Sequence, residues 1–497
     1  MNTMTKRAVS VMLSLLVCAV GGSACLLSCG GSSDGGSTTN ENSTEAVTTA
    51  DTEAVTESLY TYPEVDYGGS AFRFLNAEDI YSMRAQIDRE GLTGESLDDV
   101  MYERCREVER RVNVVLEETC RGVDTELIAE AYKILMAGED AYDAIYVPTR
   151  DMGRLTAENA LYNLYDFEEL HLDSPWWIQT YNDAIALGDS LYGAAGYSQL
   201  MVMDSLWCLY FNEDMMTNLD LDKPYDLVRQ GTWTIDRFAE YMKAAANLNG
   251  DSDFLYREGG SCIWVVSMCD LSQFLYGFGA AILRNQDGVL TPAYNEPLFI
   301  NGFEKLITEM SVPSGYVFPK NDAASDDTPG SYINIFEVER AMFVPAELSK
   351  TARLRDKDFS FGVVPFPKYD ETQERYYAIP FYGTPVYTIP VTVKDAVRSA
   401  VIGDVMTYIS YEKVLPVFRE DTLEQKGLRN EDSIEMLDLI IRSSTPNLLF
   451  VHNIGSELQT AVNAALKKGE TSIASAIAKY EPKMQKAIDA VNAQNQK

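Results

Sequence analysis

The chain has 497 residues, of which 46% are hydrophobic, and a formal net charge of −34 at pH 7. This length and apolar content predict a large buried core, divided between two lobes rather than held in one. The acidic excess argues against nucleic acid as a partner, because no surplus of Lys and Arg can neutralise phosphates, and against docking of the folded body on an anionic membrane.

The N-terminal residues have the pattern of a secretion signal. A short basic segment precedes an apolar stretch at residues 8–20, and no acid occurs before Asp34. Residues 26–29 (LLSC) then match a bacterial lipobox. We therefore predict a lipoprotein signal peptide at 1–28, with Cys29 diacylated as the new N-terminus. An ordinary signal peptide with incidental cysteines is the alternative.

A flexible acidic tether is predicted at residues 29–60. The segment is rich in Gly, Ser, Thr, Asn and Glu, and no base balances the six acids between Asp34 and Glu57. Such a composition cannot bury enough apolar surface to fold by itself. No later stretch has the length and apolarity of a membrane span. We therefore expect the mature protein on the extracellular face of the cytoplasmic membrane, attached only through its lipid.

Five cysteines follow the leader, an odd number without a CxxC pair. In a chain with so much predicted core, these residues indicate buried thiols rather than a disulfide framework. A bridge between Cys105 and Cys120 is left open.

Strand and helix patterns alternate after the tether. Residues 71–75, 112–118 and 143–147 have the composition of strands, and residues 95–112 and 124–136 between them have helical spacing. This order predicts a parallel sheet with right-handed connections.

Polar residues follow two of these strands. In open parallel sheets, ligands gather at the carboxyl ends of the strands. Glu78 and Asp79 after the first strand, and Thr149 and Arg150 after the third, are therefore candidate ligand contacts. Each could equally be a solvated turn residue.

Two adjacent tryptophans, Trp176 and Trp177, follow a proline in the next connecting stretch. Adjacent side chains rarely face the same way. We therefore expect one of the two in the core and the other facing a cleft.

The chain is organised around residues 188–216. Two β-like runs, at 190–197 and 206–211, are rich in aromatic and apolar residues. A shorter apolar piece between them ends in Asp204. The second run passes through Asn-Glu-Asp at 212–214 into a predicted helix with an Asx-type N-cap.

At this stretch the chain resembles the extracellular solute-binding proteins of ABC importers, in the two-lobed family that includes maltose-binding protein. The shared pattern is Tyr-Gly at 192–193 followed by Tyr-Phe-Asn at 210–212, which in the family forms the first crossing between the lobes. The resemblance implies an α/β fold of the periplasmic-binding-protein type II, in which each lobe is a mainly parallel sheet flanked by helices. The ligand cleft then lies between the lobes, and Tyr197 and Asp204 line it.

The resemblance also divides the chain beyond the tether. Residues 61–202 and 362–392 are expected in lobe 1. Residues 203–361 and 393–497 are expected in lobe 2, on which the C-terminal tail packs in relatives.

Two stretches of the second lobe hold further candidates. Trp264 lies near an apolar run and is either a cleft or a core tryptophan. Residues 247–258 partly fit a calcium loop, but Ser252 stands where the loop needs glycine and Asn247 replaces its first Asp. We therefore predict no metal site.

Two later patterns of the family point back to the cleft. Residues 339–348 (ERAMFVPAEL) resemble a strand that ends at the ligand, which implicates Glu347. Residues 361–370 (FGVVPFPKYD) are the most family-specific run of the chain. Tyr382 and Gly383 lie in the loop beyond it, which by resemblance faces the cleft.

The sequence lacks the patterns of common catalytic and nucleotide sites. It has two histidines and no HExxH, GxSxG, GxxxxGK[ST] or strand-linked GxGxxG pattern. We therefore expect a binding protein rather than an enzyme, with no cofactor. A glycosidase pair of carboxylates is not excluded, since the chain has 75 acids.

The composition suits a carbohydrate ligand. Aromatic faces from 29 Tyr and five Trp can stack on sugar rings, while Asp, Glu, Asn and Arg bind hydroxyls. The acidic balance suits a cationic or peptide ligand equally.

These features lead to one hypothesis and two alternatives. The hypothesis is a lipid-anchored, monomeric solute-binding subunit that captures a sugar or oligosaccharide and delivers it to an ABC permease, as the resemblance implies. The alternatives are a surface glycan hydrolase and a non-transport sensor or adhesin on the same scaffold.

Overall fold

A computed structural model of the chain describes residues 60–123, 125–245, 266–267, 271–310, 317–318, 332–339, 341–354, 357–423 and 431–495. The chain divides into the units Met1–Leu59 and Tyr60–Lys497, and all described residues belong to the second. The predicted signal peptide, Cys29, the tether apart from Tyr60, the calcium-like loop 247–258 and Trp264 lie outside the described residues.

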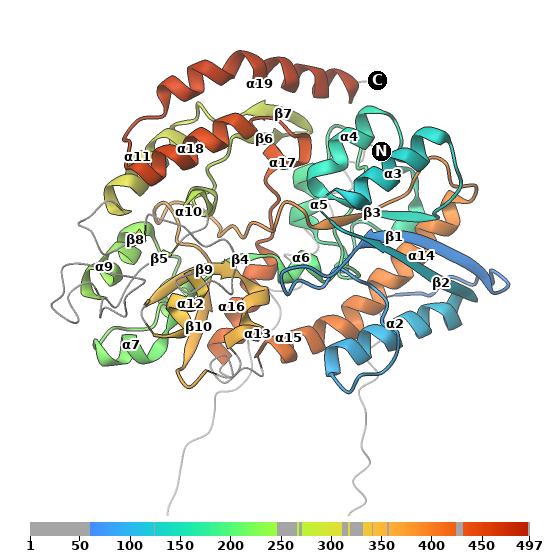
Figure 1. The fold of residues 1–497 in the computed structure, drawn as a ribbon, viewed down its shortest axis with the longest axis horizontal. Helices are drawn as coiled ribbons and strands as arrows, with labels where there is room; N and C mark the ends of the chain where they lie inside the picture. The colour runs from blue at the N-terminus through green and yellow to red at the C-terminus, as the bar shows by residue number, and fades with distance from the viewer. Residues whose placement is uncertain are drawn as a thin grey trace, which may run out of the picture. The chain divides into compact units, whose positions relative to one another are not determined.

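The first sheet has four strands in the order β11–β3–β1–β2 (Figure 1). Its three N-terminal strands run parallel and are connected by helices, as the sequence predicts, and its last strand joins β3 antiparallel. All five residues of β3 are buried, as expected for a strand covered on both faces. The elements are β1 (Ser70–Ala77), α2 (Ser96–Val112), β2 (Val114–Arg121), α3 (Glu126–Ala137), β3 (Ala144–Pro148) and β11 (Pro385–Thr388).

The second sheet has β4 (Trp207–Asn212) at its centre, between β9 (Phe343–Glu347) and β10 (Phe361–Val364). Both neighbours pair antiparallel to β4. The expected two-lobed α/β fold is confirmed, but the three strands of this sheet pair antiparallel, where the sequence predicted a mainly parallel sheet. The reason is that β9 and β10 both end beside the residues where β4 begins.

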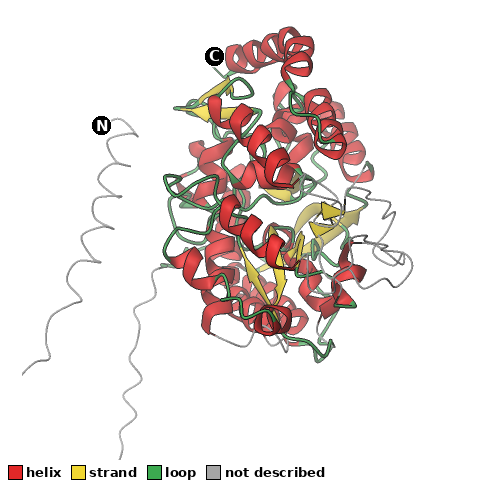
Figure 2. Cartoon of the chain, turned by 90° about the vertical axis from the view of Figure 1, so that its left-hand side faces the viewer, coloured by secondary structure: helices red, strands yellow, loops and turns green. Residues whose placement is uncertain are grey.

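Two short pairings and many helices complete the described chain, in which helices are far more extensive than strands (Figure 2). The short pairings are β5 (Val266–Ser267) with β8 (Val317–Phe318) and β6 (Leu283–Gln286) with β7 (Val289–Pro292). The helices outside the first sheet are α4 (Met152–Ala157), α5 (Gln179–Ile185), α6 (Met201–Asp204), α7 (Glu213–Asn218), α8 (Tyr225–Arg229), α9 (Ile235–Ala245), α10 (Ser272–Gly277), α11 (Pro297–Met310), α12 (Tyr332–Glu337), α13 (Thr351–Leu354), α14 (Ala396–Ile409), α15 (Leu415–Leu423), α16 (Glu431–Arg442), α17 (Leu448–His452), α18 (Ser456–Lys468) and α19 (Ala474–Gln494).

The predicted helix start after β4 is confirmed. Asn212 Oδ1 accepts a hydrogen bond from the backbone N–H of Met215 at 2.8 Å. This bond caps the first turn of α7, where two acids, Glu213 and Asp214, also face the positive end of the helix dipole.

Two chain segments cross side by side between the sheets. The first crossing is at Ser205 and Leu206, directly before β4, and the return crossing is at Phe381. The N–H of Phe381 donates to the carbonyl of Ser205 at 3.1 Å, and the N–H of Trp207 donates to the carbonyl of Ile379 at 3.1 Å. The return therefore follows β10, which corrects the expectation that residues 362–392 lie wholly in the first lobe.

Helix α14 packs with the first sheet, not with the second lobe as predicted for residues 393–497. It contacts α2, and Ser399 Oγ donates to the carbonyl of Asp143 at 2.7 Å. Residues 399–409 are buried without interruption. Because α14 is enclosed on all sides, its polar residues need partners from the first lobe.

Asp404 is the charged residue at the centre of α14, and it is fully buried. Its carboxylate accepts hydrogen bonds from Trp176 Nε1 at 2.8 Å and Trp177 Nε1 at 3.0 Å, and His171 Nδ1 lies at 2.7 Å. Tyr60 stacks on Tyr408 beside this group. The cluster joins the start of the described chain to the core of the first lobe.

The thiol predictions are tested in part. Cys105, Cys120 and Cys208 are free, so Cys105 and Cys120 do not pair, and Cys105 and Cys208 are buried as predicted. In the part of the chain that the structure describes, no helix is long and apolar enough to cross a membrane.

Replacing Asp404 with alanine should lower the free energy of unfolding by about 3 kcal/mol, because the indole N–H of Trp176 would lose its buried acceptor. Urea unfolding followed by circular dichroism measures this change. Glu420→Ala, at an exposed carboxylate of α15, is the control and should leave the midpoint unchanged. Equal midpoints for both variants would contradict the assigned role of Asp404.

Candidate functional site

The crossing brings together strand ends from both lobes. Trp207, the first residue of β4, pairs with Glu347, the last residue of β9, and the N–H of Leu348 donates to the carbonyl of Leu206 at 3.0 Å. Tyr210 supports this strand end, since its hydroxyl donates to the carbonyl of Glu347 at 3.0 Å. The predicted candidate Glu347 therefore does lie where the chain crosses between the lobes.

The loop after β1 reaches across to this strand end. Lys350 closes the short 3₁₀ helix η4 (Leu348–Lys350), and its Nζ donates to the carbonyl of Tyr81 at 3.4 Å. Residues of the first lobe and the end of β9 thus share one border.

Tyr81 and Ser82 form a strained turn in this loop. The backbones of Ile80 and Met83 exchange hydrogen bonds of 3.1 and 2.8 Å around it. Both central residues have positive φ, +54° at Tyr81 and +66° at Ser82, a region that usually requires Gly or Asn. Tyr81 is 60% exposed. Strain of this kind concentrates at functional sites, so the turn is a candidate ligand contact.

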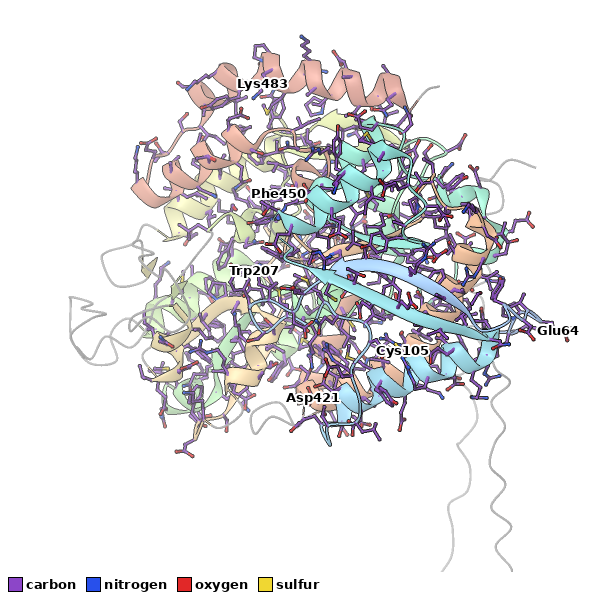
Figure 3. All side chains as sticks on the ribbon, turned by 45° about the vertical axis from the view of Figure 1, so that its right-hand side comes forward. Glu64, Cys105, Trp207, Asp421, Phe450 and Lys483 are labelled. Atoms are coloured by element: carbon purple, nitrogen blue, oxygen red, sulfur yellow. The ribbon has the colours of Figure 1, made fainter. Side chains whose placement is uncertain are left out.

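A second aromatic group lies at the return crossing. The ring of Tyr382 stacks on Phe450 of α17 with centroids 4.9 Å apart, and the Arg150 guanidinium lies 5.2 Å from the Tyr382 centroid. Tyr382 is 40% exposed. Figure 3 labels Phe450 and Trp207 in the central part of the molecule. The structure thus brings the predicted residues Arg150 and Tyr382 together.

The charge next to this aromatic group is balanced. Arg150 Nε lies 3.4 Å from Asp151 Oδ2, and its Nη2 donates to the carbonyl of Val123 at 2.8 Å. Burial raises the pKa of the Asp151 carboxyl, although Arg150 opposes this shift. An aromatic ring, a guanidinium and a carboxylate at one crossing are the groups that hold a polyhydroxylated ring.

Asp204 serves a different purpose from the predicted one. It is 1% exposed, and its carboxylate accepts hydrogen bonds from Arg84 Nε at 2.9 Å, Arg84 Nη2 at 2.7 Å and the Arg84 backbone N–H at 2.9 Å. Arg84 Nη1 also lies 3.5 Å from Asp421, labelled in Figure 3. The carboxylate therefore fixes the loop after β1, and little of it is left for a ligand.

The two acids that follow β1 are both exposed. Asp79 Oδ1 accepts hydrogen bonds from the N–H groups of Ala85 at 2.7 Å and Gln86 at 2.8 Å, and Arg89 lies 3.1 Å from its other oxygen. Asp79 thus organises the loop. Glu78 is exposed at the end of the strand.

Three of the predicted aromatic contacts are core residues. Trp176 and Trp177 are both buried around Asp404, so the expectation that one of them faces a cleft is wrong. Tyr197 is 9% exposed and packs against Tyr411, and burial raises the pKa of Tyr197 to about 12. Thr149 is also buried, with its hydroxyl bonded to Thr384.

Sequence reasoning missed Tyr81, Arg84, Lys350 and Phe450. The rule of strand ends would have reached Tyr81 and Arg84 had the whole loop after β1 been included. No local pattern marks Phe450, because tertiary packing brings α17 to Tyr382. Among the described residues, no group of three or more His, Cys, Asp or Glu could hold a metal ion.

None of the protein-family models and none of the curated proteins matches the sequence. Solved structures do match, at low identity. The sugar-binding protein MalE from Xanthomonas citri has a TM-score of 0.56 and 12% identity over 84% of this chain and 98% of that chain. UgpB from Mycobacterium tuberculosis, in complex with glycerophosphocholine, has a TM-score of 0.53 and 14% identity over 81% of this chain and 98% of that chain.

A third match is the ABC substrate-binding protein Lmo0181 from Listeria monocytogenes in complex with cycloalternan. It has a TM-score of 0.51 and 13% identity over 86% of this chain and 98% of that chain. The matches show that the chain has the two-lobed fold of these substrate-binding proteins, which agrees with the resemblance found in the sequence.

Replacing Arg84 with alanine should destabilise the protein by about 3 kcal/mol, because the buried Asp204 carboxylate would lose its ion pair. Urea unfolding measures the effect. Arg237→Ala is a matched control, since Arg237 pairs with Glu240 on an exposed helix face and such pairs add little. If the two variants unfold at the same urea concentration, Asp204 does not depend on Arg84.

His452 should make stability depend on pH. Burial lowers its pKa from 6.5 to about 4, and among the described residues none hydrogen-bonds its buried Nε2. Helix α17 approaches α4 closely, since a Cβ on Gly153 would lie 2.9 Å from the Val451 carbonyl. Because the unfolded state binds the proton first, stability should fall as the pH drops from about 6.5 to 4.

The loss attributable to His452 should reach about 3 kcal/mol at pH 4. Urea unfolding of the wild type and of His452→Gln at pH 7, 5.5 and 4 separates it from the effects of the carboxylates. The variant should lose less stability than the wild type over this range. Parallel losses would show that His452 is not buried in its neutral form.

Proposed function

We propose that the protein is the lipid-anchored, extracellular solute-binding subunit of an ABC importer. It captures a sugar or oligosaccharide between its two lobes and delivers it to the permease. The observation that carries the proposal is the meeting of Arg150, Tyr382 and Phe450 at the return crossing, in a fold shared with substrate-binding proteins.

The proposed ligand contacts are those of the crossing. Tyr81 and Tyr382 are the two exposed tyrosines there and would stack on sugar rings. Glu347, Glu78 and Arg150 would bind hydroxyls as acceptors and donors. Trp264, outside the described residues, stays a candidate from the sequence.

Capture would work as a population shift between open and closed lobes. A ligand that touches both lobes binds the closed arrangement more tightly and so favours it. The crossing segments near Ser205 and Phe381 would change their backbone angles during such a motion. The contact of Lys350 with the Tyr81 carbonyl is one that opening would break. Delivery to a permease follows from recognition of the closed form.

A thermal-shift screen of residues 60–497 tests the proposal. Mono- and oligosaccharides, including maltotetraose, are compared with amino acids, short peptides and polyamines, each at a concentration well above an ordinary dissociation constant. A sugar that binds the native state raises the midpoint of unfolding by mass action. A rise only with peptides or polyamines would overturn the carbohydrate ligand.

Alanine at Tyr81 or Tyr382 should weaken the sugar found in that screen about tenfold, or ~1.4 kcal/mol. Isothermal titration calorimetry measures the dissociation constants. Leu92→Ala, at a 64% exposed residue of the same loop as Tyr81, is the control and should bind as the wild type does. Unchanged affinity in both tyrosine variants would remove the crossing as the ligand site.

A further inference from the structure

An arginine on the buried face of α2 takes no part in the site described above. Arg104 has none of its surface exposed, and its Nε has no hydrogen-bond acceptor among the described residues. Figure 3 labels Cys105, the next residue along the helix. The guanidinium donates only to neutral groups, and no carboxylate of the described chain lies within ion-pair distance of it.

Burial without an ionic partner is costly for a guanidinium. Charged side chains are almost never fully buried unless they are paired, because desolvation of the charge must be offset. Replacing buried ionic groups by apolar side chains of similar volume is often neutral or even stabilising. Stability alone therefore does not account for Arg104, and the explanation lies in the segments that it bonds.

The guanidinium joins three segments that lie far apart in the sequence. Nη1 donates to the carbonyl of Ser198 at 3.1 Å and to Ser410 Oγ at 3.0 Å, and Nη2 donates to the carbonyl of Ile87. These acceptors belong to the stretch before α6, to the end of α14 and to the loop after β1, respectively. One side chain thus holds all three segments.

Each of the three segments continues toward the second lobe. The loop after β1 accepts a hydrogen bond from Lys350. The stretch before α6 continues through that helix into the first crossing at Ser205. Helix α14 continues past Ser410 into α15, which contacts α16, and α16 contacts β10 of the second sheet. Arg104 therefore bonds the first-lobe end of three connections between the lobes.

The helical connection contains a π-helix, η5 (Ser410–Val414), between α14 and α15. The N–H of Leu415 donates to the carbonyl of Ser410, five residues back. The Ser410 hydroxyl donates to the carbonyl of Met406 at 2.7 Å while it accepts from Arg104. Because π-helical turns are rare, frequent at functional sites and places where helices kink, Arg104 holds the turn at which this connection would bend.

We propose that Arg104 is a positioning residue that couples the three connections, so that the loop after β1, the first crossing and η5 move together when one lobe turns against the other. The proposal rests on the function proposed above, in which the lobes open and close around a ligand. A guanidinium suits this role because its terminal nitrogens, fixed in one plane, hold acceptors on two sides at once. None of the three acceptors can shift alone without leaving a buried polar group unpaired.

Hydrogen exchange of the whole protein, followed by mass spectrometry, tests the coupling. It needs no ligand, so its failure is distinct from failure of the proposed function. Arg104→Met removes the guanidinium and keeps an unbranched apolar side chain. The peptides that contain residues 84–88, 197–200 and 410–415 should each lose protection at least about threefold. Unchanged protection of β3 shows that the fold is intact. Loss in only one or two of the three peptides, or in none, would overturn the proposal.

Two further variants separate the shape of the guanidinium from its charge. Arg104→Lys keeps the charge but has one donor nitrogen in place of two, so the three peptides should not recover together. This variant also carries the test if Arg104→Met does not fold. Full protection of all three peptides with lysine would show that charge alone holds the segments, and would overturn the proposal. Arg110→Met, at an exposed arginine of the same helix, is the control and should exchange as the wild type does.

Discussion

The structure depends on a pair of hydrogen-bonded chain segments that cross from one sheet to the other. The carbonyl of Ser205 accepts from Phe381, and the carbonyl of Ile379 accepts from Trp207, so neither crossing can shift without the other. The next residue along, Leu206, accepts from Leu348 and so holds the end of β9 at the same place. These backbone hydrogen bonds thus determine which strand ends meet, and therefore where the side chains of the candidate site lie.

Two buried carboxylates hold parts of the first lobe in place beside the crossing segments. Asp404 accepts hydrogen bonds from the indole N–H groups of Trp176 and Trp177 and so joins α14 to the connecting stretch before the crossing. Asp204 accepts hydrogen bonds from the guanidinium of Arg84 and so holds the loop after β1 near the crossing. In both cases desolvation of the carboxylate is offset only when all its donors are present. Asp204, which the sequence suggested as a ligand contact, is therefore part of the scaffold.

The sequence could predict the features that depend on neighbours along the chain, but not those that depend on distant partners. Hydrophobic periodicity gave the β–α–β–α–β order of the first sheet and the capped helix after β4, because both depend on neighbours along the chain. The strand-end rule pointed to Arg150, and the family resemblance pointed to Glu347 and Tyr382. The structure places all three at the crossing, and their contact with a ligand stays a prediction. Asp204, Trp176 and Trp177, which other patterns had suggested as contacts, are buried instead, because each has a hydrogen-bond partner far away in sequence. Arg84 precedes Asp204 by 120 residues and Asp404 follows Trp176 by 228.

The antiparallel pairing of β4 and the place of α14 were missed for a related reason. Pairing direction depends on which end of β9 and β10 meets the crossing, and no local pattern records that. The apolar character of α14 on all sides predicts a buried helix but not the lobe that buries it. Only tertiary contacts, such as that of Ser399 with Asp143, decide the lobe.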